Sequence, residues 1–189
     1  MKKTLILLLA LSLTLFQPLT QVWAKKKNGE LQSFQLKQNS DQKLSKNDLR
    51  NQVEEEIFQL TNAQREKKNL KTLEKHPVLL KAARFHSEDM MKKDYFSHYS
   101  PEGKTVLERI QKFKKGYDES CGENLHQIRS ANGLYDSQSI AELMMKDWIG
   151  SVDHRKNILS KEYTNLEVGC ATDGKKIFCT QVFSGPKID

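Results

Sequence analysis

Apolar side chains recur every three or four residues along much of the chain, which is the spacing that places them on one face of a helix. The first such stretch begins at Ser45 and extends to about Lys68, with Ser45 and Asp48 arranged as in a capping box. A second helix is predicted to begin at His76-Pro77, because proline suits the first helical position. The inward-facing positions of these two predicted helices are Leu49, Val53, Ile57 and Leu60, and then Leu79, Ala82, Ala83, His86 and Met90.

Two further helices are predicted later in the chain. Residues 105–108 form another capping box, which opens a short helix through Phe113. Helical spacing returns between Ile140 and Trp148. Because Trp148 shares a helical face with Ile140 and Met144, its side chain is predicted to be buried.

Three segments are predicted to be strands, namely Cys121–Ile128, Leu166–Ala171 and Ile177–Phe183. The last two are joined by Asp173-Gly174, a strong hairpin-turn signal. Helices therefore come first and antiparallel strands finish the chain, without repeated alternation of strand and helix. This order favours an α+β fold, with layers of helix and antiparallel sheet, over a doubly wound parallel sheet.

The chain has three cysteines, and their pairing depends on the loop between the last two predicted strands. A four-residue loop, Asp173–Lys176, would place Cys170 directly opposite Cys179, close enough for a disulfide. A two-residue turn would leave Cys179 two residues out of register, and Cys121 would then be the alternative partner. Three reduced, buried cysteines are the third alternative.

The first 24 residues have the pattern of a secretory signal peptide. Two lysines precede an apolar run from Leu5 to Phe16, and Val22-Trp23-Ala24 supplies small residues at positions −3 and −1 of a cleavage site. The run is too short for a membrane anchor, because a spanning helix needs about 20 apolar residues. We therefore expect cleavage after Ala24, export to the periplasm or the exterior, and no transmembrane segment in the mature chain.

Composition divides the remaining chain in two. Residues 25–44 are rich in Lys, Gln, Asn and Ser, and their few large apolar groups cannot offset the entropy of ordering, so they are predicted to be a flexible basic extension. Residues 45–189 are predicted to be a single domain. Most of the net charge of +7 lies at the N-terminus, since residues 51–189 carry 22 basic and 21 acidic side chains. A nucleic-acid-binding domain would have a basic face of its own, so no nucleic-acid partner is expected.

Candidate chemistry rests on histidines and one acid. His86 lies in a predicted inward-facing stripe and is expected to be structural, and His76 at a helix start is expected to be a cap or a surface group. His98 and His154 each follow an ordered element in a polar, loop-like setting, where functional side chains concentrate. Glu123 is a lone acid between glycine and apolar residues, where a merely solvated carboxylate is less expected. No local metal, phosphate-binding or nucleophile motif unites these residues, so only the fold could bring them together.

Five short motifs occur in an order that resembles one family. They are Leu60-Thr61-Asn62-Ala63-Gln64-Arg65, Phe96-Ser97-His98-Tyr99-Ser100-Pro101-Glu102-Gly103, Gly122-Glu123-Asn124-Leu125, Trp148-Ile149-Gly150-Ser151-Val152-Asp153-His154-Arg155-Lys156-Asn157-Ile158-Leu159, and Val168-Gly169 followed by Thr180-Gln181-Val182-Phe183. Together they resemble the CAP superfamily of cysteine-rich secretory proteins, antigen 5 and pathogenesis-related class-1 proteins, also called the SCP domain. The resemblance covers about residues 53–184 and points to the bacterial exported branch.

This resemblance implies a three-layer α-β-α sandwich with an antiparallel central sheet, and a surface cleft lined by two histidines and two acids. By position, the histidines are His98 and His154, and the first acid is Glu123. The second acid falls on Ser151, and Asp153 replaces the glycine that usually precedes the second histidine. A hydroxyl in place of a carboxylate removes a charge and a hard ligand, which weakens any divalent-metal site and weighs against catalysis.

The resemblance therefore implies an exported, non-enzymatic binding or interaction module whose cleft takes a lipid, an ion, an envelope component or a partner protein. No cofactor is required and no residue is assigned a catalytic role. An optional divalent metal would be held by His98, His154 and Glu123, and zinc is expected because two imidazoles suit zinc better than hard cations. One alternative is a metal-assisted hydrolase that uses the same cleft. A second is a structural or adhesive surface protein that uses the Lys25–Lys27 tail.

Overall fold

The computed structural model describes residues 26–27, 30–31, 44–134 and 136–187. The chain divides into two units, residues 1–42 and 43–189. In the first unit, Lys26–Lys27 (β1) pairs antiparallel with Glu30–Leu31 (β2). The predicted signal peptide and most of the predicted extension lie outside the described residues.

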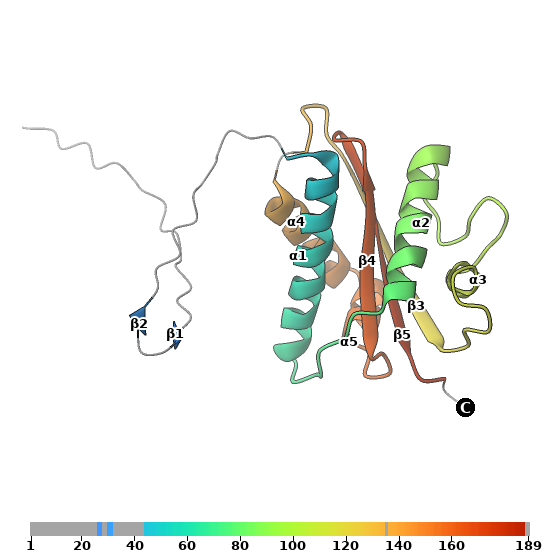
Figure 1. The fold of residues 1–189 in the computed structure, drawn as a ribbon, viewed down its shortest axis with the longest axis horizontal. Coiled ribbons are helices and arrows are strands. Elements are labelled where there is room, and N and C mark those ends of the chain that lie inside the picture. The colour runs from blue at the N-terminus through green and yellow to red at the C-terminus, as the bar shows by residue number, and fades with distance from the viewer. Residues whose placement is uncertain (1–25, 28–29, 32–43, 135, 188–189) are drawn as a thin grey trace, which may run out of the picture. The chain divides into compact units, whose positions relative to one another are not determined.

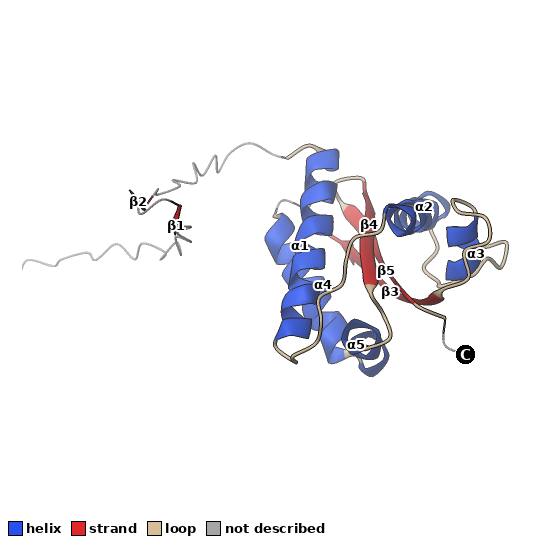
Figure 2. Cartoon of the chain, turned by 60° about the horizontal axis from the view of Figure 1, so that its bottom comes forward, coloured by secondary structure: helices blue, strands red, loops and turns tan. Residues whose placement is uncertain are grey.

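The second unit is a three-layer sandwich in which helices cover both faces of an antiparallel sheet (Figure 1). Figure 2 shows α1, α4 and α5 on one side of this sheet and α2 and α3 on the other. The sheet order is β3-β5-β4, so the last strand of the chain is the central one. The elements are α1 (Lys46–Glu66), α2 (Pro77–Lys93), α3 (Val106–Gln111), β3 (Ser120–Arg129), α4 (Ser137–Gly150), α5 (Val152–Leu159), β4 (Asn165–Thr172) and β5 (Lys176–Gly185). The expected α-β-α sandwich is confirmed.

Successive residues of β5 point to opposite faces and build two cores, because side chains alternate along a strand. One face carries Cys179 and Phe183 into the core shared with α1 and α4, where Trp148 is 0% exposed. The other face carries Phe178 and Val182 toward α2 and α3. The predicted burial of Trp148 is confirmed.

The hairpin between β4 and β5 selects one of the cysteine alternatives. Thr172 pairs with Ile177, which leaves the four-residue loop 173–176, and Cys170 lies directly opposite Cys179. These two cysteines form a disulfide, with their Cα atoms 4.2 Å apart. Cys121 carries a free thiol and is partly buried.

Three predicted helix starts are confirmed, because each of these caps forms a local hydrogen bond to the backbone. The Ser45 side chain accepts from the backbone of Asp48, and His76 accepts from the backbone of Val78. Thr105 and Glu108 form the full capping box that begins α3.

No helix among the described residues has both the length and the apolar character needed to cross a membrane.

The helix α5 lacks the apolar spacing that marks the others. Ile158 is its one buried residue, and Val152 is 69% exposed. The expectation that His154 lies in a loop-like setting is therefore wrong, because His154 is inside this helix.

Both edge strands of the sheet have backbone groups bound by side chains from the helices. On β4, the backbone N–H of Cys170 donates to Glu54 Oε1 at 2.8 Å. On β3, the carbonyl oxygen of Leu125 accepts from Trp148 Nε1 at 3.0 Å, and that of Glu123 accepts from Asn157 Nδ2 at 3.2 Å. These contacts protect the edges from pairing with other strands and fix the position of β3, which carries Glu123.

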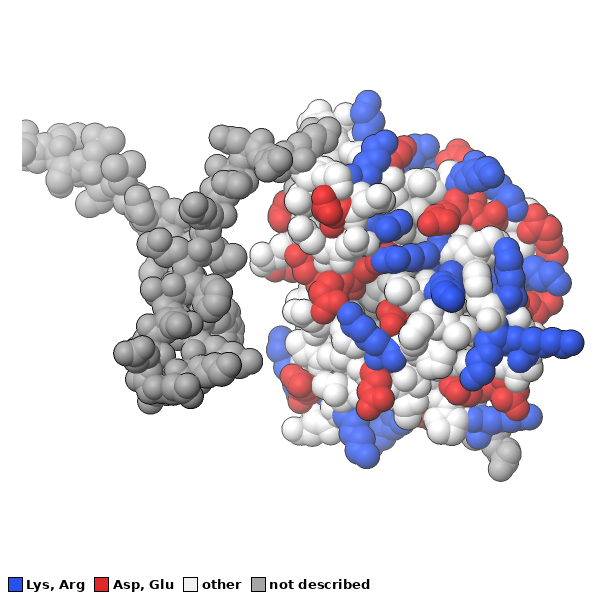
Figure 3. Space-filling view, in the orientation of Figure 1, with Lys and Arg blue, Asp and Glu red and all other residues white. Residues whose placement is uncertain are grey.

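Charged side chains of both signs are interspersed over the face of the molecule that Figure 3 shows. Ion pairs join α1 to neighbouring segments, such as Arg84 with Glu54 and Lys75 with Glu55. This mixture agrees with the nearly balanced charge of residues 51–189.

Candidate functional site

His98 lies in the loop between α2 and α3, and two hydrogen bonds within the loop and to α2 hold its position. The backbone N–H of Ser100 donates to the carbonyl oxygen of Lys104 at 3.1 Å. The buried His86 ring of α2 bonds through Nε2 to the carbonyl oxygen of Ser97 at 2.9 Å. This contact agrees with the structural role expected for His86. The side chain of His98, the residue after Ser97, is half-exposed.

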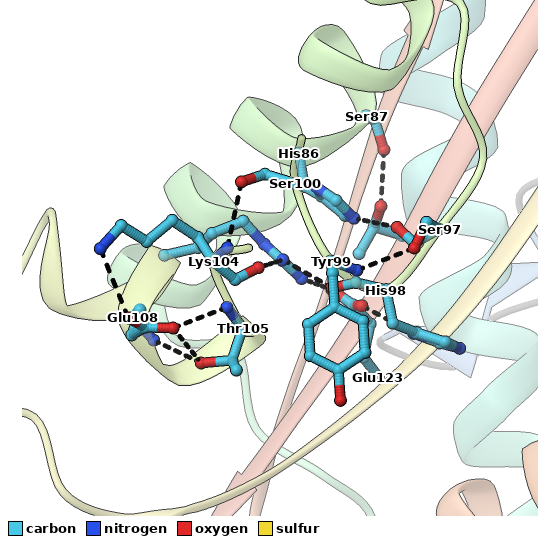
Figure 4. A network of polar contacts seen from close by, with 12 residues as sticks. His86, Ser87, Ser97, His98, Tyr99, Ser100, Lys104, Thr105, Glu108 and Glu123 are labelled. Carbon is cyan, nitrogen blue, oxygen red and sulfur yellow. Dashed lines mark hydrogen bonds and ion pairs between the residues drawn. The ribbon is translucent and has the colours of Figure 1, made fainter. Parts of the chain in front are cut away.

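One carboxylate oxygen of Glu123 is bonded to the His98 ring (Figure 4), and the other is bonded to Arg109. His98 Nδ1 lies 2.8 Å from Glu123 Oε1, and the Arg109 guanidinium contacts Oε2. Glu123 is 8% exposed and Arg109 is 3% exposed. Because an ionised carboxylate only accepts hydrogen bonds, Nδ1 of His98 is the donor in this contact.

Arg109 also ties the two ends of the loop together. Its Nη1 donates to the carbonyl oxygens of His98 and Lys104, each at 2.8 Å. The sequence pattern does not mark Arg109, because arginine in a short, charged helix resembles a solvated side chain. Only its contacts with Glu123 and the loop distinguish it.

His154 lies on the other side of edge strand β3. Asn124, the residue after Glu123, donates through Nδ2 to the carbonyl oxygen of His154 at 3.1 Å. Since consecutive residues of a strand point to opposite faces, Glu123 faces α3 while Asn124 faces α5. Asn157 of α5 completes the connection by donating to Asn124 Oδ1 at 2.9 Å.

Electrostatics link the histidines that the fold brings to this edge. Burial lowers the pKa of His154, the neighbouring imidazoles of His98 and His126 lower it further through repulsion between protonated rings, and Asp153 raises it. The His154 ring is therefore neutral at physiological pH, and His98 is close enough to influence it. The two predicted histidines thus lie at the same edge of the sheet, one from each helical layer.

Ser151 and His126 complete the surroundings of His154. Ser151 is the residue between α4 and α5, and its backbone N–H donates to the carbonyl oxygen of Asp147 at 3.0 Å. His126 bonds through Nε2 to Asp147 Oδ2 at 2.9 Å and packs edge-on against Trp148. No sequence motif distinguishes His126 from any other histidine at a strand position.

The residues expected to hold a metal provide only part of a ligand set. In the part of the chain that the structure describes, no three His, Cys, Asp or Glu side chains are grouped closely enough to hold a metal ion. Both Glu123 oxygens are engaged by His98 and Arg109. The groups that remain for a metal or another ligand are the imidazole nitrogens of His98 and His154.

Two neighbouring features limit the chemistry. Burial, with a contribution from Glu119, raises the pKa of the Cys121 thiol to about 12, so this cysteine is protonated at neutral pH and is a poor nucleophile. A cavity of about 340 Å³ lies between α2 and α3, and Phe85, His86 and Arg109 are among its lining residues. Arg109 therefore lines this cavity and also contacts Glu123.

The family model described as "CAP: Cysteine-rich secretory protein family" matches residues 58–183. The chain belongs to the CAP family. A CAP relative, the uncharacterized protein YkwD of Bacillus subtilis, is 37% identical over 132 residues, which cover 70% of this chain and 47% of the relative. The uncharacterized membrane protein YlbC of the same organism is 33% identical over 130 residues, covering 69% of this chain and 34% of YlbC. The chain thus spans less than half the length of these two relatives.

Structural comparison agrees with this assignment. An extracellular SCP-domain protein from Bacillus anthracis is similar with a TM-score of 0.61 and 33% identity, over 77% of this chain and 45% of that one. An outer surface protein from Borrelia burgdorferi matches with a TM-score of 0.60 over 77% of this chain and 98% of that one. At 17% identity, the second match supports the CAP fold alone.

Proposed function

We propose that this CAP domain is an exported, non-enzymatic binding module whose ligand is held by the imidazole nitrogens of His98 and His154. The observation that carries the proposal is the hydrogen bond of His98 Nδ1 to the buried carboxylate of Glu123. A carboxylate that fixes the tautomer of a neighbouring histidine makes the other ring nitrogen a more basic donor of an electron pair. This arrangement prepares Nε2 of His98 to receive a ligand.

His154 is the second contact with the ligand. Burial lowers its pKa, so the neutral ring also has an unprotonated nitrogen at pH 7. Ser151 supplies a hydroxyl at the start of α5 where the resemblance implies an acid. The site therefore favours ligands that accept electron pairs from nitrogen, and it has little attraction for hard divalent cations.

Zinc is the simplest ligand that would test these two nitrogens. Zinc takes imidazole ligands at about 2.0–2.1 Å and tolerates water in its other positions. With two protein ligands and Glu123 acting behind one of them, we expect weak binding. We also expect binding to be lost in acid, because protonated imidazole cannot bind a metal.

The test is isothermal calorimetry of zinc binding to the wild type, His98→Ala and His154→Ala at pH 7.5 and pH 5.5. His76→Ala is the matched control, since His76 caps α2 and lies outside the site. We expect wild type and His76→Ala to bind at pH 7.5 and all four proteins to fail at pH 5.5. Equal affinity in the four proteins at pH 7.5 would place the metal elsewhere. Absence of binding to the wild type would refute zinc as a ligand.

The natural ligand would be an envelope lipid, a peptidoglycan fragment or a partner protein. A thermal-shift screen of lipids and peptidoglycan fragments against wild type and His98→Ala tests the first two classes. A shift in the wild type that is reduced in His98→Ala supports the site. A shift of equal size in both proteins would place binding outside it.

Export is the second part of the proposal. It is supported by the lysines, the short apolar run and the Val22-Trp23-Ala24 ending of residues 1–24. It is also supported by similarity to an extracellular SCP-domain protein. N-terminal sequencing of protein recovered outside the cytoplasm should begin at Lys25. Recovery of membrane-bound protein with an intact Met1 would contradict cleavage.

Hydrolysis is the alternative, because a histidine oriented by a carboxylate is also the arrangement of a general base. In that reaction, Nε2 of His98 would take a proton from water, and no covalent intermediate on Cys121 is expected, given its raised thiol pKa. Hydrolysis of an ester substrate by the wild type that His98→Ala abolishes would favour the enzyme over the binding module.

A further inference from the structure

We propose that Arg109 is a positioning residue, which holds Glu123 as the acceptor of the His98 Nδ1–H group and thereby directs Nε2 of His98 toward the ligand. The inference rests on the proposed function only in the use made of Nε2. The tautomer of His98 can be measured without any ligand. Arg109 thereby has a defined role in the site, although no sequence motif marks it.

The contacts of Arg109 join the three parts that the task requires. Its guanidinium pairs with Glu123 on β3 and donates to the carbonyl oxygens of His98 and Lys104 in the loop. It comes from α3, whose start is locked by the capping box of Thr105 and Glu108. One nearly buried side chain therefore sets both the position of the His98 backbone and the orientation of the Glu123 carboxylate.

The Arg109 guanidinium is the ion partner of Glu123, which is only 8% exposed. A buried carboxylate without an ion partner is costly, and removing one member of a buried pair leaves the other uncompensated. Without Arg109, the carboxylate would turn toward water. It would then stop acting as a fixed acceptor for Nδ1–H. Because the tautomer of a histidine follows the hydrogen bond made by one of its nitrogens, the His98 proton would then redistribute to Nε2.

The same pairing defines what a ligand meets at this site. Arg109 balances the charge of Glu123, and Ser151 stands where the second acid is expected. The ligand therefore meets a nitrogen lone pair with a neutralised carboxylate behind it. This favours zinc or a hydrogen-bond donor over a cation that requires oxygen ligands.

The test is long-range ¹⁵N–¹H correlation spectroscopy of the histidine rings in the full-length chain at pH 7.5 without metal. The His98 signals are assigned by their loss in His98→Gln. The variants are Arg109→Met, which removes the guanidinium, and Arg109→Lys, which retains the charge. Arg65→Met is the matched control, because Arg65 is 2% exposed and donates to the carbonyl oxygens of Lys71, Ile158 and Ser160 but pairs with no carboxylate in the described residues.

We expect the Nδ1–H tautomer in the wild type, Arg109→Lys and Arg65→Met, and a loss of that form in Arg109→Met. A purely structural role would disturb the two methionine variants alike and would leave the tautomer of each folded protein unchanged. If Arg109→Met does not fold, as judged by its amide spectrum, Arg109→Gln replaces it with the same expected loss. An Nε2–H tautomer in the wild type, or an unchanged Nδ1–H form without the Arg109 charge, overturns the inference.

Zinc titration of the same samples separates this inference from the proposed function. If the wild type binds zinc, Arg109→Met should bind it at least about tenfold more weakly, in the range found for residues that support metal-bound histidines. If the wild type binds no zinc, the zinc proposal fails, while the tautomer measurement still decides the role of Arg109. Equal zinc affinity in wild type and folded Arg109→Met would contradict the positioning role.

Discussion

Replacement of Gly169 by alanine should strongly destabilise the domain, because a single methyl group at this position meets backbone atoms of α2. A Cβ on Gly169 would lie 2.2 Å from the backbone nitrogen of Arg84 and 2.5 Å from the carbonyl carbon of Ala83. Ordinary contacts begin at 3.4 Å. The helix and strand would therefore have to separate by about 1.2 Å, the difference between 3.4 and 2.2 Å.

The cost follows from what α2 holds at this point. Overpacking a core typically costs about 1–3 kcal/mol when side chains can adjust. Here backbone faces backbone, and the shift also strains the bonds of Ser87 Oγ to the Gly169 carbonyl oxygen at 2.7 Å and to Thr180 Oγ1 at 2.8 Å. A buried hydrogen bond contributes about 1 kcal/mol. We expect Gly169→Ala to lose at least about 3 kcal/mol, a large share of the roughly 5–15 kcal/mol that stabilises a typical domain.

The assay is urea unfolding followed by far-ultraviolet circular dichroism at pH 7.5. Gly150→Ala is the matched control, since a Cβ there meets nothing within 4 Å and the residue lies in α4. Alanine in a helix is favoured over glycine by about 0.5–1 kcal/mol, so the control should be unchanged or slightly more stable. A loss below about 1 kcal/mol in Gly169→Ala would refute the close approach of α2 and β4.

Three further predictions concern stability. Trp148→Ala should cost about 3–5 kcal/mol in urea melts, because the ring is fully buried and its Nε1–H is bonded to a backbone carbonyl oxygen; a cost well below about 1 kcal/mol would mean that the ring is not packed. Reduction of the Cys170–Cys179 disulfide should lower the free energy of unfolding by about 2–3 kcal/mol, the chain-entropy value for a loop with a sequence separation of 9. Equal urea midpoints of unfolding with and without reductant would contradict this prediction. Burial lowers the pKa of His86 below its ordinary 6.5, so the unfolded chain binds the proton more readily and the free energy of unfolding should fall as the pH drops below 6.5. His86→Gln should reduce this decline, although His154 continues to contribute in the same direction. An identical dependence of stability on pH in the variant and the wild type would exclude a role for His86.

Local features of the fold are predictable from the sequence alone. Three helices begin after a capping side chain that bonds to the backbone two or three residues further along, namely Ser45, His76 and Thr105. The apolar spacing that buries Trp148 is also confined to a few turns of one helix. Because these interactions join neighbours along the chain, the order of residues carries them directly.

The hairpin and α5 required tertiary information. The Asp173-Gly174 signal is compatible with two registers of the β4–β5 pair. The four-residue loop follows from the observed pairing, in which Cys170 lies opposite Cys179. The helix α5 buries one residue and is tied to β3 by the side chains of Asn124 and Asn157. Neither pairing leaves a periodic pattern in the sequence.

The candidate site divides in the same way. The types and order of His98, Glu123 and His154 are visible in the sequence, and their resemblance to a family marked them as site residues. The sequence could not show that Glu123 faces α3 while His154 lies beyond β3, or that Arg109 holds the Glu123 carboxylate. These relations join residues on separate elements, and the packing of two helical layers against one edge strand alone determines them.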